Sequence, residues 1–282
     1  MKFRRYDNML TFKSDVLDIL LEHEVQNNLL LSLISGSSIH RSADWLLASV
    51  SGGGGGVALT ALFIKPFSLL LFETGNNAEP GAAELLAREM RRMGRLPSGV
   101  MANRDLARRF ADVFIGAGKG RLHMKTSAMR LDKLSDHKKA QGFCRELEKR
   151  DMYYAPFWER SFSEDCRSHV FTIPEYTDRL SGRLGKGTHF IWEDGVPVSQ
   201  AVHGRDTPNG AVINMVYTPP QYRGHGYAAS VVSTLSETLL HSGKKFCCLF
   251  ADLDNPVSCG IYRKLGYYDV CELEEIRFDI KP

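Results

Sequence analysis

The stretch VYTPPQYRGHGYAAS, residues 216–230, joins a strand-like run to a helix-like run through two prolines and two glycines. Pro219 and Pro220 cannot donate the hydrogen bonds of a β-ladder, so they end sheet pairing. After Arg223, apolar residues recur at helical spacing, which predicts a helix over 224–242. The stretch therefore predicts a strand that ends beside the beginning of a helix.

The glycines at this junction favour an anion-binding site. The first N–H groups of a helix lack internal partners, and the helix dipole places partial positive charge there. Gly224 and Gly226 leave these amides uncovered, and the small side chain of Ala228 does not block access to them one turn later. Arg223 adds a cation that can clasp an anion such as a pyrophosphate. His225 could add charge when protonated, although a solvent-exposed filler is the simpler interpretation.

Two nucleotide-binding loops are disfavoured by missing residues. The junction does not complete G-x-G-x-x-G, and no acidic residue ends a second strand about 20 residues later, which argues against a dinucleotide site. The glycine run SGGGGG, residues 51–56, is not followed by the Lys-Ser or Lys-Thr of a phosphate-binding loop. We expect a flexible turn before a strand at that position.

A second informative stretch is DLDNPVSCGIYRKLGYYDV, residues 252–270. Asn255 before Pro256 is typical of a helix start, and Gly266 is typical of a helix end. Considered alone, Asn255 is a helix cap and Tyr262 is a packed aromatic with its hydroxyl at the rim. Their functional interpretation depends on the first stretch.

Together the two stretches resemble the conserved motifs of the GNAT superfamily of N-acetyltransferases. Arg223-x-x-Gly226-x-Ala228 is similar to the R/Q-x-x-G-x-G/A signature of that family. Residues 255–267, NPVSCGIYRKLGY, are similar to its second block, N-x-x-S/A-x-x-x-Y-x-K-x-G-F/Y. The resemblance is close over roughly 190–282 and implies an α/β fold with a mixed sheet, of the GNAT acyl-CoA transferase type.

The resemblance also implies where acetyl-coenzyme A would bind. Strands 210–217 and 245–252 would be a parallel pair that splays apart, with the pyrophosphate on the amides after the first strand. The pantetheine arm would run along the first strand like an added strand, opposite Asn255 and Ser258. The implied cofactor-binding residues are Val216, Tyr217, Arg223, Gly224, His225, Gly226, Tyr227, Ala228, Asn255 and Ser258. No metal is implied.

The implied reaction transfers an acetyl group to a primary amine of a small molecule or peptide. Tyr262 would be the catalytic acid that protonates the leaving thiolate. The base is open, because residues 214–217, NMVY, lack the glutamate that many relatives carry there. Asp252 and Glu193 could act through water, or could be surface turn residues. A catalytically silent acyl-CoA sensor and a transferase of a longer acyl or aminoacyl group remain alternatives.

The order of predicted elements divides the chain in two. We place a divergent amino-terminal domain over 1–120, with an element order compatible with a decayed copy of the same fold, and a GNAT domain over 121–282. This layout resembles tandem-type bacterial acetyltransferases, and the first domain would shape the acceptor cleft, support a homodimer or act as a scaffold.

Elements expected in the first domain are a helix from Ser14 to about Ile34 that stops at Gly36, two strands within 57–75, and helices over 81–94 and from Asn103. Elements expected in the second are strands 122–132, 188–193, 197–203, 210–217, 245–252 and 267–279, and helices across 136–165, 224–242 and 256–265.

Composition excludes several classes of protein. The chain has 282 residues, of which 43% are hydrophobic and 24% charged, as in soluble globular proteins. The formal net charge is only +3, and the arginine-rich region 88–109 has no aromatic stacking platform, so we expect no nucleic-acid partner. The six cysteines include no C-x-x-C pair and are expected to be reduced thiols of a cytoplasmic protein. The apolar run 29–36 is too short to span a bilayer, so we expect no membrane anchor.

Overall fold

The computed structural model describes residues 1–35, 45–75, 79 and 81–279. The chain divides into two compact units, one made of Met1–Ala128 with Val270–Pro282 and the other of Met129–Asp269. The division falls inside the strands β6 (Arg121–Leu131) and β12 (Tyr268–Arg277), so each of these strands has residues in both units.

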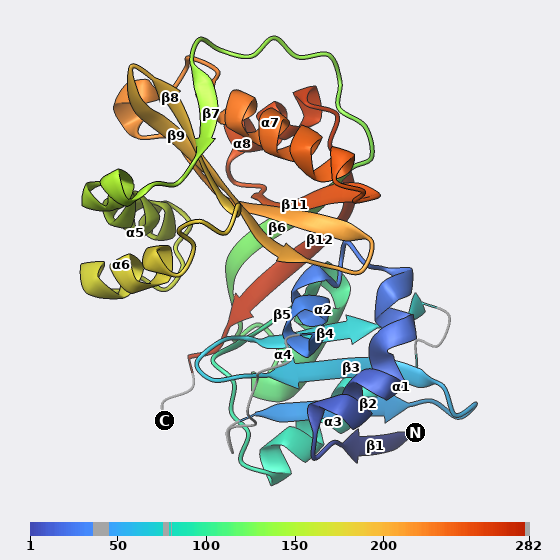
Figure 1. Cartoon of the computed structure of the whole chain (residues 1–282). Coiled ribbons are helices and arrows are strands. Elements are labelled where there is room, and N and C mark those ends of the chain that lie inside the picture. Colours follow the sequence, from blue (N-terminus) through green and yellow to red (C-terminus); the bar gives the residue numbers. More distant parts are fainter. Residues whose placement is uncertain (36–44, 76–78, 80, 280–282) are drawn as a thin grey trace. The chain divides into compact units, whose positions relative to one another are not determined.

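The first unit is a mixed sheet with helices on both faces (Figure 1). Its strands lie in the order β1-β2-β3-β4-β5-β12-β6, and β4 and β5 are parallel. Its other elements are β1 (Lys2–Arg5), α1 (Met9–Glu22), α2 (Asn28–Ser35), β2 (Leu46–Ser51), β3 (Val57–Phe63), β4 (Leu69–Glu73), α3 (Ala82–Arg92), β5 (Gly99–Asn103) and α4 (Arg104–Ile115).

Strand alternation builds two cores in this unit. In β2, Leu46, Ala48 and Val50 are buried in a cluster with residues of α3 and α4. Leu47, between them, is buried in a separate cluster with residues of α1 and α2. Because successive side chains of a strand point to opposite faces, a single strand contributes to both cores.

The predicted elements of this half are partly confirmed. The structure contains β3, β4 and α3, and Asn103 caps α4 by accepting a hydrogen bond from the Leu106 amide at 2.9 Å. Residues 51–56 form the end of β2 and the turn before β3, as expected. The short strands β1, β2 and β5 were not predicted.

The prediction of one helix from Ser14 to about Ile34 is wrong. The helix α1 begins at Met9, because Asn8 caps it through a 2.8 Å hydrogen bond from the Thr11 amide, and Ser14 lies inside it. A turn then separates α1 from α2, where the side-chain amide of Asn27 donates to the Leu20 carbonyl. The predicted stop at Gly36 lies outside the described residues.

The second unit is also a mixed sheet with helices on both faces (Figure 1). Its strands lie in the order β6-β11-β10-β9-β8-β7, and β10 and β11 are parallel. Its other elements are β7 (Phe143–Glu146), η2 (Lys149–Tyr153), α5 (Ala155–Asp165), α6 (Ile173–Ser181), β8 (His189–Asp194), β9 (Val196–Asp206), β10 (Gly210–Tyr217), η3 (Pro220–Tyr222), α7 (Tyr227–His241), β11 (Phe246–Asp252) and α8 (Pro256–Lys264).

All predicted strands of this half and the helices α7 and α8 are confirmed within a few residues, but the prediction of helices across 136–165 is only partly right. Residues 143–146 form β7, which pairs antiparallel with β8 from Phe143–Glu193 to Glu146–Phe190. Sheet pairing and the side chain of Arg145 therefore override the helical pattern here. The helix α6, which Thr172 begins with a capping box, was not predicted.

The two units share one order of elements. Each runs strand, two helices, three antiparallel strands, helix, strand, helix, and in each the last two strands of that series are parallel, β4 with β5 and β10 with β11. In both units the helix that follows the three antiparallel strands has a glycine with a left-handed conformation at its N-cap, Gly81 for α3 and Gly226 for α7. In the described part of the chain, no helix is long and apolar enough to cross a membrane.

Candidate functional site

The parallel strands β10 and β11 separate halfway along their length. Their paired positions run from Gly210–Phe246 to Val212–Cys248. Beyond that point β10 continues to Tyr217 and β11 to Asp252 with no further paired position in the described ladder. The two strands are therefore joined at their beginnings and open at their ends, as the resemblance implied.

A bulge increases this separation. The register between β10 and β9 shifts between Asn214 and Tyr217, and Met215 has a left-handed φ of 52°. A non-glycine residue at such an angle marks a bulge that bends its strand. Val216 consequently has no paired position on β9 or on β11 among the described pairs, so its backbone is placed for an extended ligand to hydrogen-bond alongside it.

The loop before α7 has the backbone of an anion site. Gly224 and Gly226 both have positive φ, 84° and 81°, which side chains disfavour. In the described structure no side chain caps α7, so the amides of its first turn are uncovered. A Cβ atom at Gly224 would meet nothing within 4 Å, and one at Gly226 would come no closer than 3.9 Å to Ala140. The surface above these amides is open enough for an anion.

Arg223 lies beside this loop with its side chain partly engaged. Its Nε donates to the Thr218 carbonyl at 3.0 Å, and its Nη2 donates to Asp165 Oδ2 at 3.0 Å. Both members of this ion pair are about half exposed. The sequence motif located the arginine but gave no sign of the carboxylate, which comes from α5.

His225 and Tyr227 have specific partners in the loop. The exposed His225 ring stacks on Tyr227, with ring centroids 5.6 Å apart, and its Nδ1 lies 2.9 Å from the Arg223 carbonyl. The Tyr227 hydroxyl donates to Asp194 Oδ2 at 2.5 Å, and this bond raises the pKa of Tyr227. Ala228 is partly exposed in the first turn of α7. The loop is thus connected to β8 through the Tyr227 hydroxyl and carries a stacked pair of rings.

Asn255 performs the capping role that its sequence position suggested. Its Oδ1 accepts a hydrogen bond from the Ser258 amide at 3.1 Å, at the first turn of α8. This bond uses the oxygen of the side-chain amide and leaves its NH₂ group as a donor. A cap of this kind is compatible with a second role as a hydrogen-bond donor to a ligand.

Tyr262 lies on the inner side of α8. The residue is 8% exposed, and its ring packs edge-on against Tyr267 with centroids 6.0 Å apart. Burial, aided by the nearby thiols of Cys166 and Cys259, raises the pKa of Tyr262. No hydrogen bond within the described residues engages its hydroxyl. The phenol is therefore protonated at neutral pH and is free to donate.

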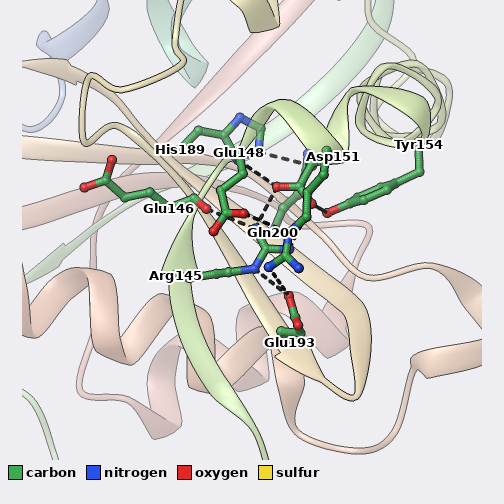
Figure 2. Close-up of polar contacts among 9 residues, drawn as sticks. Arg145, Glu146, Glu148, Asp151, Tyr154, His189, Glu193 and Gln200 are labelled. Carbon is green, nitrogen blue, oxygen red and sulfur yellow. Dashed lines mark hydrogen bonds and ion pairs between the residues drawn. The ribbon is translucent and has the colours of Figure 1, made fainter.

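The two candidate bases are both held by arginines. Glu193 of β8 pairs with Arg145, which also binds Asp151 through two nitrogens at 2.7 and 2.8 Å (Figure 2). Asp252 at the end of β11 lies 3.4 Å from Arg167 and accepts from the Asp254 amide. Among the described residues, no group of His, Cys, Asp and Glu could hold a metal ion.

A row of aromatic rings lies between α5 and the open end of β10. Tyr154 contacts Trp158, with centroids 4.5 Å apart, and Trp158 contacts Tyr217, with centroids 6.2 Å apart. Tyr153 and Phe157, next in the sequence, are 75% and 53% exposed. The run YYAPFW, residues 153–158, is the sequence signal for this wall, and it was not predicted to line the site.

Comparisons with known proteins agree with this geometry. Residues 194–276 match the family model described as FR47-like protein. A GCN5-related N-acetyltransferase from Sphaerobacter thermophilus is similar in structure with a TM-score of 0.70 and 15% identity, over 99% of this chain and 96% of that one. A GNAT-family acetyltransferase from Colwellia psychrerythraea has a TM-score of 0.61 and 8% identity, over 99% and 100%.

A tandem GNAT protein of the clavulanic acid biosynthesis pathway has a TM-score of 0.60 and 13% identity, over 100% of this chain and 99% of that one. No curated protein sequence matches this chain. The matched chains are covered almost end to end, and both halves of this protein are included. The chain therefore shares its fold with these GNAT structures over both halves, as the two motifs implied for the second half and the order of elements implied for the whole chain.

Proposed function

We propose that this protein transfers an acyl group, most simply the acetyl group of acetyl-coenzyme A, to a primary amine. The observation that carries the proposal is the divergence of β10 and β11 after Val212 and Cys248, next to the uncapped beginning of α7. An unpaired strand edge can hydrogen-bond the amides of a pantetheine arm, and bare helix amides can bind a pyrophosphate. The fold shared with the GNAT structures supports the same assignment.

The residues present suit both ends of that ligand. The anion loop offers the amides after Gly224 and Gly226, with the Arg223 guanidinium beside them. The open edge of β10 offers the unpaired backbone of Val216, and Asn255 offers its free NH₂ group. Because coenzyme A is anionic at one end and carries two amides in its arm, this donor set fits its chemistry.

The chemistry then requires little from the protein. The neutral amine nitrogen forms a bond to the acyl carbon and the carbon–sulfur bond breaks, so that the sulfur leaves as a thiolate and the nitrogen gives up one proton to water. Tyr262 would donate its phenolic proton, or a hydrogen bond, to that sulfur. A raised pKa keeps the phenol protonated but makes full transfer of its proton to a thiolate less favourable, so the hydrogen bond carries more of the effect. The aromatic row of Tyr154, Trp158 and Tyr217 would form a wall for the acceptor.

The decisive experiment compares two glycines that flank α7, one before the helix and one after it. Gly224 and Gly243 both have positive φ, 84° and 98°, and a Cβ at either would meet nothing within 4 Å. Gly224→Trp and Gly243→Trp therefore impose a similar backbone strain at opposite ends of one helix. By calorimetry, we expect native protein and Gly243→Trp to bind acetyl-coenzyme A and Gly224→Trp to lose binding. Equal affinity of both variants would remove the loop from the site.

A second function is favoured by one specific observation. Both carboxylates that could serve as a base, Glu193 and Asp252, are paired with arginines. A protein without a base could bind acyl-coenzyme A as a sensor and transfer nothing. Thiol release measured over a panel of aliphatic, aromatic and peptide amines separates the two functions. Tight acetyl-coenzyme A binding without turnover of any amine would favour the sensor.

A further inference from the structure

The bulge of β10 breaks a β-ladder inside the second unit, and buried polar side chains take over the lost hydrogen bonds. Gln200 of β9 donates from Nε2 to the Met215 carbonyl at 3.4 Å. Ser199, its neighbour, donates from its hydroxyl to the Tyr217 carbonyl at 3.2 Å. Both side chains are fully buried. Two adjacent residues of β9 therefore bind the two ends of the bulged segment.

His189 of β8 fixes the orientation of Gln200. Its Nε2 lies 3.3 Å from Gln200 Oε1, and both side chains are labelled in Figure 2. Because the NH₂ group of Gln200 is used by Met215, its oxygen faces the imidazole and must accept. Nε2 of His189 therefore carries the proton, and this tautomer follows from the network. The bonds form a chain from imidazole to amide to the backbone of the bulge.

The surroundings of His189 keep its ring neutral. His189 is 1% exposed, and burial lowers its pKa to about 3, with a further lowering by Arg183. The charged groups that face it are Arg183 and Asp151, which are themselves paired with Glu159 and Arg145. Among the described residues, Nδ1 of His189 has no hydrogen-bond partner. The imidazole is thus a neutral donor committed to Gln200.

A buried amide and a buried imidazole lower the stability of the fold unless their polar atoms form hydrogen bonds. A buried polar group that lacks a partner costs roughly 1–3 kcal/mol, whereas an apolar side chain of similar shape costs nothing. On the same strand, the neighbouring residues Val198 and Ala201 are apolar and buried in the core. The polar pair occurs at the bulge, where a backbone carbonyl lacks a strand partner.

We infer that Gln200, oriented by His189, is a positioning residue that holds the β10 bulge in the shape that opens the strand pair. Met215 keeps its left-handed conformation because its carbonyl is bound from β9, and Val216 thereby stays off both neighbouring ladders. The consequence for catalysis rests on the proposed function. A loosened bulge would weaken the hydrogen bonds of the Val216 backbone to the pantetheine arm, which contribute about 1 kcal/mol each, whereas a shift of about 1 Å in the acyl group can cost about 10²-fold in rate, so kcat should fall more than affinity.

The first experiment uses Gln200→Met, which keeps the length of the side chain and removes the donor. Its matched control is Asn27→Leu, because Asn27 is also a buried amide that donates to a backbone carbonyl, that of Leu20, in the first unit. Hydrogen exchange of the peptide covering 213–218 should quicken at least about tenfold in Gln200→Met and stay native in Asn27→Leu. Unchanged exchange in Gln200→Met would overturn the inference.

The second experiment measures turnover with the best amine of the panel. We expect kcat of Gln200→Met to fall about 10- to 100-fold, with KM for acetyl-coenzyme A changed less than about threefold, and Asn27→Leu to match the native protein. Faster exchange with native kcat would limit Gln200 to a structural role and overturn the positioning role. If the native protein transfers no acyl group, the proposed function fails, whereas the exchange comparison still decides whether Gln200 holds the bulge.

A third variant guards against simple misfolding. Gln200→Glu keeps the shape of the side chain, but a carboxylate cannot donate to the Met215 carbonyl, whereas a protonated carboxyl can. At pH 8 the exchange of residues 213–218 and the kcat of this variant should therefore change in the same direction as in Gln200→Met, although the side-chain shape is kept. Native exchange and native kcat in Gln200→Glu would contradict a donor role for residue 200.

Discussion

Val212 and Cys248 form the last paired position between the parallel strands β10 and β11. Everything that the proposed site needs lies beyond this pair within one unit: the bulge at Met215, the loop of Gly224 and Gly226, and Tyr262 on α8. The two strands are paired in register up to this position, and β10 bulges farther along, between Asn214 and Tyr217. The site is thus a consequence of where pairing stops, and single side chains adjust it.

Asp165 would compete with the anion of the proposed ligand for Arg223. The carboxylate lies 3.0 Å from the guanidinium beside the anion loop, and both side chains are about half exposed. We expect Arg223→Ala to weaken acetyl-coenzyme A binding about tenfold, because a charge-assisted hydrogen bond is lost. We expect Asp165→Asn to strengthen binding about two- to threefold, because exposed ion pairs contribute less than about 1 kcal/mol.

The control for this pair is Glu164→Gln. Glu164 is the adjacent residue of α5, has the same charge and pairs with Arg160 on its own helix. Calorimetry at two salt concentrations should show native affinity for Glu164→Gln and a smaller salt dependence for Arg223→Ala. If Glu164→Gln strengthens binding as much as Asp165→Asn, the effect belongs to net charge and not to the ion pair.

Asn255 permits a separation of capping from ligand binding. Its Oδ1 caps α8, and an aspartate caps a helix as well as asparagine does. Asn255→Asp should therefore keep the native melting temperature but weaken acetyl-coenzyme A binding, because the NH₂ donor is lost. Asn255→Ala should also lower the free energy of unfolding by about 1 kcal/mol. Native affinity in Asn255→Asp would reduce Asn255 to a cap alone.

Tyr262 and its ring partner Tyr267 form a matched pair for testing the acid. Tyr262→Phe should lower kcat about 10²-fold with little change in the affinity for acetyl-coenzyme A, because the donor to the leaving sulfur is lost. Tyr267 donates or accepts a hydrogen bond with Ser236 on α7 at 2.8 Å. Tyr267→Phe should lower the melting temperature and keep kcat within about threefold of native. Equal kcat in the two variants would refute the assignment of Tyr262.

The sequence predicted the parts of this site that depend on local chemistry. Gly224 and Gly226 adopt left-handed angles that only glycine tolerates well, and Asn255 before Pro256 begins a helix whatever surrounds it. The residue type alone favours the local conformation at such positions, whatever the rest of the chain does. The strand pair and the two helices that follow it were therefore predicted close to their observed bounds.

The parts that the sequence did not predict depend on residues far apart in the chain. Strand β7 forms because residues 143–146 pair with β8. One side-chain contact between these strands, from Arg145 to Glu193, joins residues 48 positions apart in the sequence. The link from Asp165 to Arg223 spans 58 positions, and the link from Gln200 to Met215 depends on a bulge that alternation cannot reveal. Periodicity reports which face a residue occupies, but it does not report which distant partner lies on that face.

The buried imidazole of His189 gives the second unit a defined response to acid. Burial lowers the pKa of His189 to about 3, whereas an unfolded histidine titrates near 6.5. Between these two pH values the unfolded chain binds more protons at this residue than the folded chain does. The free energy of unfolding therefore rises with pH in this range, and the stabilising contribution of His189 decreases as the pH falls below about 6.5. Chemical denaturation of the native protein should show a loss of about 3 kcal/mol from this group between pH 7 and pH 4.

His189→Gln removes the titrating group and keeps a donor for Gln200, so its free energy of unfolding should depend less steeply on pH over the same range. Asp151 contributes in the same direction in both proteins, because its hydrogen bonds with Arg145 hold its pKa low despite burial. The difference between the two curves therefore isolates the histidine. His225→Gln, a change at an exposed ring, is the control and should follow the native curve. Parallel curves for native protein and His189→Gln would mean that the imidazole is not held neutral beneath the bulge.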